Sequence, residues 1–343
     1  MRATLLLAAA LFASGCLSAV ASDERLPDPA DGQVPDGPGA GTAAGHGAPQ
    51  RTEGPVTVTL GPDGYVAAQD VEVRNDFGGA ADANVRLATR NGAITVAAGA
   101  EGGYRLAAHL EGRGKTEQEA RAALATLTVL NQDDLAGGVL AIGMQVRFDD
   151  PPSPAPAPLP VTACLAACGD GGALQRSASI VATLPAAPAL DLEADATNGG
   201  LGVEGLHGPR LRLDTTNGAI NVQGAWDKAD LDSTNGGIHL DALVNDLAAS
   251  TTNGGIEGTL RSQRTCSQSL STTNGGVSLT VKDGGHGYKV KGSTTNGHVA
   301  IAVAGAHASG KDVQAETPGF HGEAIQVTLS ARSTNGNVRV SSA

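Results

Sequence analysis

Aliphatic and polar residues alternate in the C-terminal half of the chain, on both sides of a repeated Thr-Asn-Gly triplet. Ile238 and Leu240, which follow one triplet, are aliphatic, and His239 between them is polar. The same alternation precedes another triplet over residues 211–213. A period of two places successive side chains on opposite faces of a β-strand, so that one face is buried and the other is exposed to water. Each copy therefore predicts a strand, an Asn-Gly turn, a second strand and a return loop.

The triplets recur at a nearly constant spacing. Successive asparagines are 19, 18, 18, 21, 22 and 39 residues apart, and the last interval fits two units of about twenty. We place the missing copy at residues 316–319, where Pro318 stands in the position of the asparagine. The asparagines of the predicted turn ladder are Asn198, Asn217, Asn235, Asn253, Asn274, Asn296 and Asn335.

The fixed period favours a parallel β-solenoid over a series of two-residue hairpins, although Asn-Gly is also a strong hairpin signal. In a solenoid each unit forms one coil, and equivalent positions stack about 4.8 Å apart. Asparagine tolerates left-handed backbone angles, and stacked Asn amides can hydrogen-bond from coil to coil. The sequence therefore predicts an all-β fold, with a parallel β-solenoid of about eight coils and a period of 18–22 over residues 164–343.

Residues 53–150 predict a small strand-rich module with one helix that precedes the solenoid. Its stretches of period two include one that surrounds an Asn-Gly turn at Asn91. Thr116 and Glu119 fit a capping box, and the apolar residues that follow at helical spacing predict a helix near 116–131. We expect this helix to cover an apolar end or face that the strands leave open.

The N-terminus has the features of an export signal. Arg2 and the apolar run 5–12 precede Ala13-Ser14-Gly15-Cys16, and this run is too short to span a bilayer. The small residues before Cys16 resemble a lipobox. We therefore expect residues 1–15 to be a lipoprotein-type signal peptide and Cys16 to carry the lipid that holds the exported protein at the membrane. An ordinary signal peptide with an incidental cysteine is the alternative.

Two further segments have compositions that do not favour a packed core. Residues 16–52 are rich in Pro, Gly, Ala and Asp, which predicts a disordered tether between the lipid and the folded part. Residues 151–163 are rich in proline, which predicts a semi-rigid linker between the module and the solenoid. The chain is therefore predicted to consist of a signal peptide, a tether, a module, a linker and a solenoid.

Composition and charge restrict the core and the partners. The chain contains 48 glycines, and only 2% of its residues are aromatic, which indicates a thin core of small aliphatic side chains. Its net charge is −12, and no cluster of Lys and Arg interrupts the acidic balance. Binding to a phosphate backbone depends on clustered cations, so we expect no nucleic-acid partner.

No pattern in the sequence indicates catalysis or a metal site. The eight histidines are scattered without metal-ligand spacing, and the outward positions of the repeats carry no repeated carboxylate. Calcium-binding repeats place aspartates in their turns, whereas the turns here carry neutral asparagine. Asp214 and Asp232 precede two of the turns, but serine takes this position in later copies. We therefore expect no enzymatic activity, no cofactor and no metal.

The remaining cysteines fit an exported protein. Cys164 and Cys168 are close enough in sequence to form a small disulfide at the start of the solenoid. Zinc binding is the rival interpretation, but no fourth ligand stands nearby. Cys266 is either a free thiol or the partner of one of the other two.

Repeated Thr-Thr-Asn-Gly-Gly-Ile units behind an export signal resemble the adhesin family of bacterial and archaeal β-strand-repeat surface proteins, together with the related toastrack and head-GIN adhesin domains. The stretch Thr116-Glu117-Gln118-Glu119-Ala120 also resembles the N-terminal portion of some members. The resemblance covers roughly residues 55–343. It implies a β-repeat architecture and, by the family's label, adhesion.

Two functions remain open from the sequence. The first is a non-catalytic surface lipoprotein that contacts a cell, a polymer or an envelope protein through one flank of the solenoid. The second is an envelope-stress or sensory accessory protein that acts through protein–protein contacts. In either case the ligand is unidentified, and the candidate binding face consists of the outward residues Arg212, His239, Glu257 and Lys291.

Overall fold

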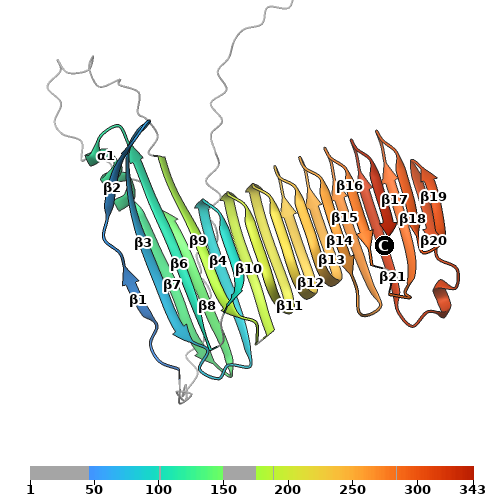
Figure 1. The fold of residues 1–343 in the computed structure, drawn as a ribbon, viewed down its shortest axis with the longest axis horizontal. Helices are drawn as coiled ribbons and strands as arrows, with labels where there is room; N and C mark the ends of the chain where they lie inside the picture. Colours follow the sequence, from blue (N-terminus) through green and yellow to red (C-terminus); the bar gives the residue numbers. More distant parts are fainter. Residues whose placement is uncertain (1–45, 100–101, 150–174, 188, 283) are drawn as a thin grey trace, which may run out of the picture. The chain divides into compact units, whose positions relative to one another are not determined.

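Each repeat contributes one coil to a flattened parallel β-solenoid, in which the coils stack on one another (Figure 1). The computed structural model describes residues 46–99, 102–149, 175–187, 189–282 and 284–343. Every coil has one segment before its Asn-Gly turn and one after it. The coils together form two walls, which we call the pre-turn wall and the post-turn wall, with the core between them. The predicted all-β solenoid is confirmed.

Strands of neighbouring repeats are parallel and in register within each wall, so that Ile238 lies between Ile220 and Ile256. Three long strands bend from the post-turn wall into the pre-turn wall: β11 (Leu201–Asn217), β12 (Ile220–Ser233) and β13 (Ile238–Thr251). The other post-turn strands of the repeats are β14 (Ile256–Arg261), β16 (Val277–Val281), β18 (Val299–Val303) and β22 (Val338–Ser342). The other pre-turn strands are β10 (Ala189–Asn198), β15 (Cys266–Thr272), β17 (Gly287–Thr294) and β21 (Gln326–Ser333).

The N-terminal strands continue the same two walls. Strand β4 (Asp82–Asn91) pairs in parallel with β10, and β5 (Ile94–Gly99) pairs in parallel with β11. The post-turn wall extends further through β9 (Gln175–Pro185), β6 (Gly103–Gly114), β3 (Gly64–Asp76), β1 (Gln50–Glu53) and β2 (Thr57–Gly61). The pre-turn wall extends through β8 (Val139–Phe148) and β7 (Leu127–Ala136). Strand pairing therefore joins the predicted module to the solenoid in one continuous structure.

The single α-helix in the described residues, α1 (Glu117–Ala125), packs on β6 and β3. Thr116 and Glu119 form the expected capping box. Gly112 on β6 permits the close approach, because a Cβ there would lie 2.2 Å from the backbone nitrogen of Leu124. The helix ends earlier than predicted, since residues 127–136 pair with β8 as a strand. Strand pairing satisfies the backbone of this stretch and overrides its helical spacing.

The order of the last coils differs from the order in the sequence. The predicted copy at residues 316–319 is wrong, because Glu316 ends β20 (Asp312–Glu316), which pairs antiparallel with β17. Strand β19 (Ala306–Gly310) pairs antiparallel with β18, and the short helix η2 (Phe320–Gly322) follows β20. The chain then turns back, and β21 and β22 enter between the two preceding coils. The interval of 39 residues therefore contains a cap and a return, and no additional coil.

An asparagine ladder runs along the turns. Apart from the first rung, each Asn Nδ2 donates a hydrogen bond to the Oδ1 of an adjacent rung, with donor–acceptor distances of 2.6–2.8 Å. All seven asparagines of the predicted ladder take part. Asn91 supplies a further rung, which is not preceded by threonine and was not among the predicted triplets. Within the described residues the rungs follow in the order Asn91, Asn198, Asn217, Asn235, Asn253, Asn274, Asn335 and Asn296.

The glycine after each asparagine allows the turns to touch. A Cβ on Gly254 would lie 2.1 Å from the carbonyl oxygen of Gly236, and the equivalent glycines of the other rungs are equally close. The same glycine carbonyls accept hydrogen bonds from buried hydroxyls two residues before the asparagines, as from Thr251 to Gly236 at 2.8 Å. Ala196 occupies this position in one coil and cannot donate. The Gly92 carbonyl consequently lacks the hydroxyl donor that its counterparts have.

The register of the walls is tested by two neighbouring residues. Ile256 is fully buried, whereas Glu257 is exposed beside His239. Ile256→Asp places an unpaired carboxylate in the core and should lower the free energy of unfolding by about 3–5 kcal/mol. Glu257→Lys removes only an exposed ion pair and should change it by less than about 1 kcal/mol. Equal melting temperatures of the two variants would contradict the assigned faces.

The buried hydroxyls two residues before the asparagines are tested by adding the one that is missing at Ala196. Ala196→Ser should place a donor next to the Gly92 carbonyl and raise the free energy of unfolding by about 0.5–1.5 kcal/mol. Serine already fits the equivalent position at Ser233. The opposite change, Thr251→Ala, leaves the Gly236 carbonyl without this donor and should cost about 1–2 kcal/mol. Denaturant unfolding of the two variants measures both changes, and a destabilising Ala196→Ser would refute the proposed geometry.

Candidate functional site

The predicted binding face divides between the two walls. His239 and Glu257 are adjacent on the outer side of the post-turn wall, and their Nδ1 and Oε1 atoms are 3.1 Å apart. Arg212 and Lys291 lie on the pre-turn wall, in one outward column but several strands apart. Arg212 also lies 3.9 Å from Glu193. The structure therefore brings together the first pair and separates it from the second.

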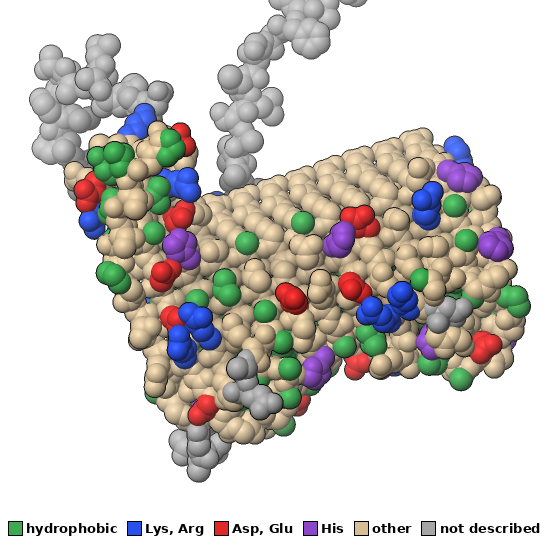
Figure 2. All heavy atoms as spheres, in the orientation of Figure 1, with side chains coloured by type: hydrophobic (Ala, Val, Ile, Leu, Met, Phe, Trp, Pro, Cys, Tyr) green, Lys and Arg blue, Asp and Glu red, His purple; other side chains and the backbone are tan. Residues whose placement is uncertain are grey.

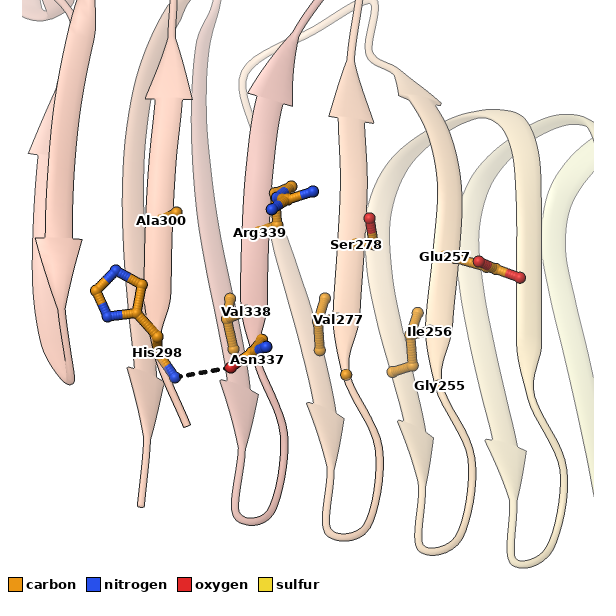
Figure 3. A pocket seen from close by; sticks show the side chains of 11 residues that line it. Gly255, Ile256, Glu257, Val277, Ser278, His298, Ala300, Asn337, Val338 and Arg339 are labelled. Carbon is orange, nitrogen blue, oxygen red and sulfur yellow. Dashed lines mark hydrogen bonds between the residues drawn. The ribbon is translucent and has the colours of Figure 1, made fainter. Parts of the chain in front are cut away.

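A shallow pocket lies on the outer side of the post-turn wall, where it crosses four coils (Figure 3). Its volume is about 420 Å³. Gly255 and Gly276 are among its lining residues, and Glu257 and Arg339 are the acidic and basic side chains that line it. Figure 3 shows these two charged side chains on strands separated by the strand that carries Ser278. We call this site the post-turn pocket.

Arg339 is the free cation of the post-turn pocket. It forms no ion pair or side-chain hydrogen bond with any other part of the chain that the structure describes. Its neighbours in register are Ser278 and Ala300, which carry no charge. The backbone nitrogen of His298 donates to Asn337 Oδ1 at 3.0 Å, which holds the Asn337 side chain in place at that side of the pocket. The pocket can therefore offer a guanidinium, a carboxylate and a hydroxyl to one ligand without losing an internal contact of Arg339.

Charge elsewhere on the surface is dispersed. Figure 2 shows basic and acidic side chains scattered over the face in view, with no large patch of one sign. On the pre-turn wall, Arg86 and Arg212 both lie near Glu193, the closer contact being 3.0 Å. Pairs of this kind neutralise one another at the surface. The face in view thus lacks the single-sign field that would attract a highly charged polymer over a distance.

Three aspartates form an unusual column on the pre-turn wall. Asp195, Asp214 and Asp232 are direct neighbours in register on adjacent strands. Burial, together with the charges of Glu193 and Asp214, raises the pKa of Asp195 to about 6, and Arg212 and Arg86 oppose this shift. Burial also raises the pKa of Asp214, with a further contribution from Asp232. The strand register holds these carboxyl groups side by side, and this arrangement destabilises the ionised forms of Asp195 and Asp214.

A buried polar cluster joins His46 to the sheet. The fully buried carboxylate of Asp133 lies 2.6 Å from His46 Nε2 and accepts hydrogen bonds from the Tyr104 hydroxyl at 2.5 Å and from Asn75 at 2.7 Å. Burial and the hydrogen bond to Asp133 raise the pKa of Tyr104 well above its usual range. Both carboxylate oxygens of Asp133 thus have partners within the protein, and the cluster fastens the chain at His46 to β7. Nothing in the sequence pattern indicated it, because its members are far apart along the chain.

The cysteines and possible metal ligands form no site in the described residues. Cys266 is buried on β15 as a free thiol, and burial raises its pKa. Cys16, Cys164 and Cys168 lie outside the described residues, as do the predicted signal peptide and proline-rich linker. No three His, Cys, Asp or Glu side chains are grouped so that they could hold a metal ion in the part of the chain that the structure describes.

The post-turn pocket could not be predicted from the sequence. Its lining residues come from four coils, and Arg339 enters because β22 lies between β16 and β18. In the sequence, Arg339 occupies the same outward position of its repeat as His239 and Glu257. The outward positions could be identified from the sequence, but the neighbours of Arg339 among them depend on the order in which the coils stack.

One family model matches the repeat region of the chain. Residues 184–341 match the family model described as Toastrack DUF4097, which confirms the resemblance to toastrack domains over this range. No curated protein matches the chain.

Similar solved structures include two proteins of low sequence identity. One is a putative cell adhesion protein from Clostridium sporogenes, with 7% identity, a TM-score of 0.36, and coverage of 86% of this chain and 100% of that chain. Another is a putative adhesin from Bacteroides fragilis, with 11% identity, a TM-score of 0.33, and coverage of 81% of this chain and 97% of that chain.

The aspartate column predicts a pH dependence of stability. Because the pKa of Asp195 is raised in the folded state, from 3.8 to about 6, the folded protein binds more protons than the unfolded chain between these values. The free energy of unfolding should therefore fall, through this group, as the pH rises across that interval. Asp195→Asn should remove this part of the dependence and stabilise the protein by about 1 kcal/mol at neutral pH, after allowance for screening by solvent. Thermal unfolding of the wild type and of Asp195→Asn at several pH values measures this dependence.

The control for this prediction is Asp312→Asn, which changes an exposed carboxylate on β20. It should leave the slope of stability against pH unchanged. A slope that is identical in the wild type and in Asp195→Asn would contradict the role assigned to the column.

Proposed function

We propose that this protein is a non-catalytic, lipid-anchored adhesin of the cell surface, which contacts cells, polymers or envelope proteins through the post-turn wall. The observation that carries the proposal is the post-turn pocket, a shallow and open site on a rigid wall, where Arg339 has no ion-pair partner among the described residues. Recognition requires such a preorganised set of polar groups, whereas catalysis requires reactive groups in mutual reach.

The rigidity of the wall supports this function. Each pocket strand is paired on both sides: β14, β16 and β22 have parallel neighbours, and β18 pairs in parallel with β22 and antiparallel with β19. A ligand that binds there meets side chains whose spacing is already set, so that little conformational entropy is lost on binding. The open shape of the pocket favours many weak contacts over the enclosure of a small molecule. Several tethered copies on one membrane would add such contacts by avidity.

Anchoring belongs to the proposal as well. It rests on the Ala13-Ser14-Gly15-Cys16 sequence, which is typical of lipidation after export. In the described residues, no helix is both long enough and apolar enough to cross a membrane. A lipid on Cys16, followed by the segment 17–52, would place the solenoid outside the membrane and leave the post-turn wall accessible.

The proposal is tested by reversing the charge of Arg339. Arg339→Glu should reduce the binding of bead-displayed protein to its target cells or glycans by about tenfold or more, because it changes a complementary charge into a repulsive one. Arg332→Glu is the matched control, since Arg332 is an exposed arginine on the pre-turn wall. The measurement compares monomeric and bead-displayed protein on whole cells and on a glycan array.

Equal binding by the two variants would exclude the post-turn pocket as the recognition site. Turnover of any polymer by the purified protein, or tight binding of one small molecule that does not depend on display, would overturn the non-catalytic adhesin function. Capture of an envelope protein with no binding to cells or glycans would favour the accessory function instead.

A further inference from the structure

The coil formed by β21, the Asn335 turn and β22 is inserted between two coils that precede it in the sequence. Strand β21 pairs in parallel with β15 on one side and with β17 on the other. Strand β22 pairs in the same way with β16 and β18. Residues 326–342 thus fill a slot that the earlier parts of the chain leave between the Asn274 and Asn296 rungs (Figure 1).

The inserted coil completes both neighbours. Its side chains Val327, Leu329 and Val340 are fully buried in the common core. Asn335 donates to Asn274 and accepts from Asn296, at 2.8 and 2.7 Å. Without this coil, the facing edges of the two neighbouring coils would be unpaired in both walls. Unpaired edges of this kind bind another β-strand readily.

A short segment, exposed over most of its length but buried at Phe320, connects the inserted coil to the rest of the molecule. Thr317 is anchored, because its backbone nitrogen donates to the Tyr288 carbonyl and its hydroxyl accepts from the Tyr288 nitrogen, both at 2.9 Å. Residues 321–324 are exposed, and Gly319 has a φ of 78°. The eight residues 318–325 can span about 27 Å when extended. This segment has the properties of a hinge.

We propose that residues 326–342 are an exchangeable coil, which can fill the same slot in a second copy of this chain and so form a reciprocal dimer. The slot of the second copy offers the same strand partners, the same asparagine rungs and the same core. Exchange therefore conserves every contact of the coil and changes only the hinge, which is the condition for domain swapping. Because the coil is central in both walls, exchange requires partial unfolding and occurs mainly during folding.

This interaction is independent of the proposed adhesin function. It would join two solenoids through their own coils and leave the outer side of the post-turn wall unchanged in composition. The partner is defined by chemistry that the chain itself contains, namely a strand, a Thr-Asn-Gly turn and a second strand with buried aliphatic positions.

The first experiment refolds the full chain at protein concentrations from about 1 μM to about 1 mM. Size-exclusion chromatography with light scattering then measures the share of dimer, which should rise at least about tenfold with concentration by mass action. A second measurement locates the exchanged coil. Thr280 and Ser341 are partners in register, so one full-length chain carries Thr280→Cys and another carries Ser341→Cys. After the two are refolded together and oxidised, a disulfide between the chains is expected.

The matched control uses two double variants that are oxidised before refolding. Thr280→Cys with Ser341→Cys ties the coil into its own slot and should abolish the dimer. Glu257→Cys with Ser278→Cys joins two neighbouring strands that do not exchange, and should leave the dimer intact. The proposal is overturned by a protein that remains monomeric at every concentration, by a dimer that persists in the first variant, or by the absence of the disulfide between the chains.

Discussion

Contact between the glycines of successive turns is the constraint on which the structure depends. The carbonyl of one glycine occupies the space in which the next glycine would carry its Cβ, at 1.9–2.1 Å. Only glycine permits this approach, and the approach brings the asparagine amides within hydrogen-bond distance of one another. Once the turns are stacked in this way, the residues on either side have no freedom of register. The walls, their buried faces and their outward columns all follow from the contact at the turns.

Most of this architecture could be predicted from the sequence, because it depends on local periodicity. The alternation around Ile238, His239 and Leu240 indicates which side chains are buried, and the regular interval indicates one coil for each repeat. The capping box at Thr116 marked the start of the helix correctly. Its end could not be predicted, since the pairing of residues 127–136 with β8 is a tertiary interaction. Asn91 was recognised as a turn, but its place in the ladder depends on contacts with Asn198 that are remote in sequence.

The arrangement of the last coils could not be predicted for a different reason. Every coil has similar edges, so the coil at Asn335 fits beside Asn274 as well as beside Asn296 in terms of its residue pattern. The return through β19, β20 and η2 decides the outcome, and it has no Thr-Asn-Gly signature. The candidate site depends on the same feature. Arg339 reaches the post-turn pocket only because β22 is inserted, and a sequential stack would have placed Ala300 beside Ser278.

The most direct test of this account is a disulfide between outward positions of neighbouring coils in the folded monomer. Ser278 and Arg339 are partners in register, whereas Ser278 and Ala300 are separated by a further strand. Adjacent strands are about 4.8 Å apart, within the range of a disulfide, and strands two steps apart are about 9.6 Å apart and beyond it. Oxidation should therefore cross-link Ser278→Cys with Arg339→Cys and should not cross-link Ser278→Cys with Ala300→Cys. The opposite result would show that the coils are stacked in the order of the sequence and would contradict the inserted coil.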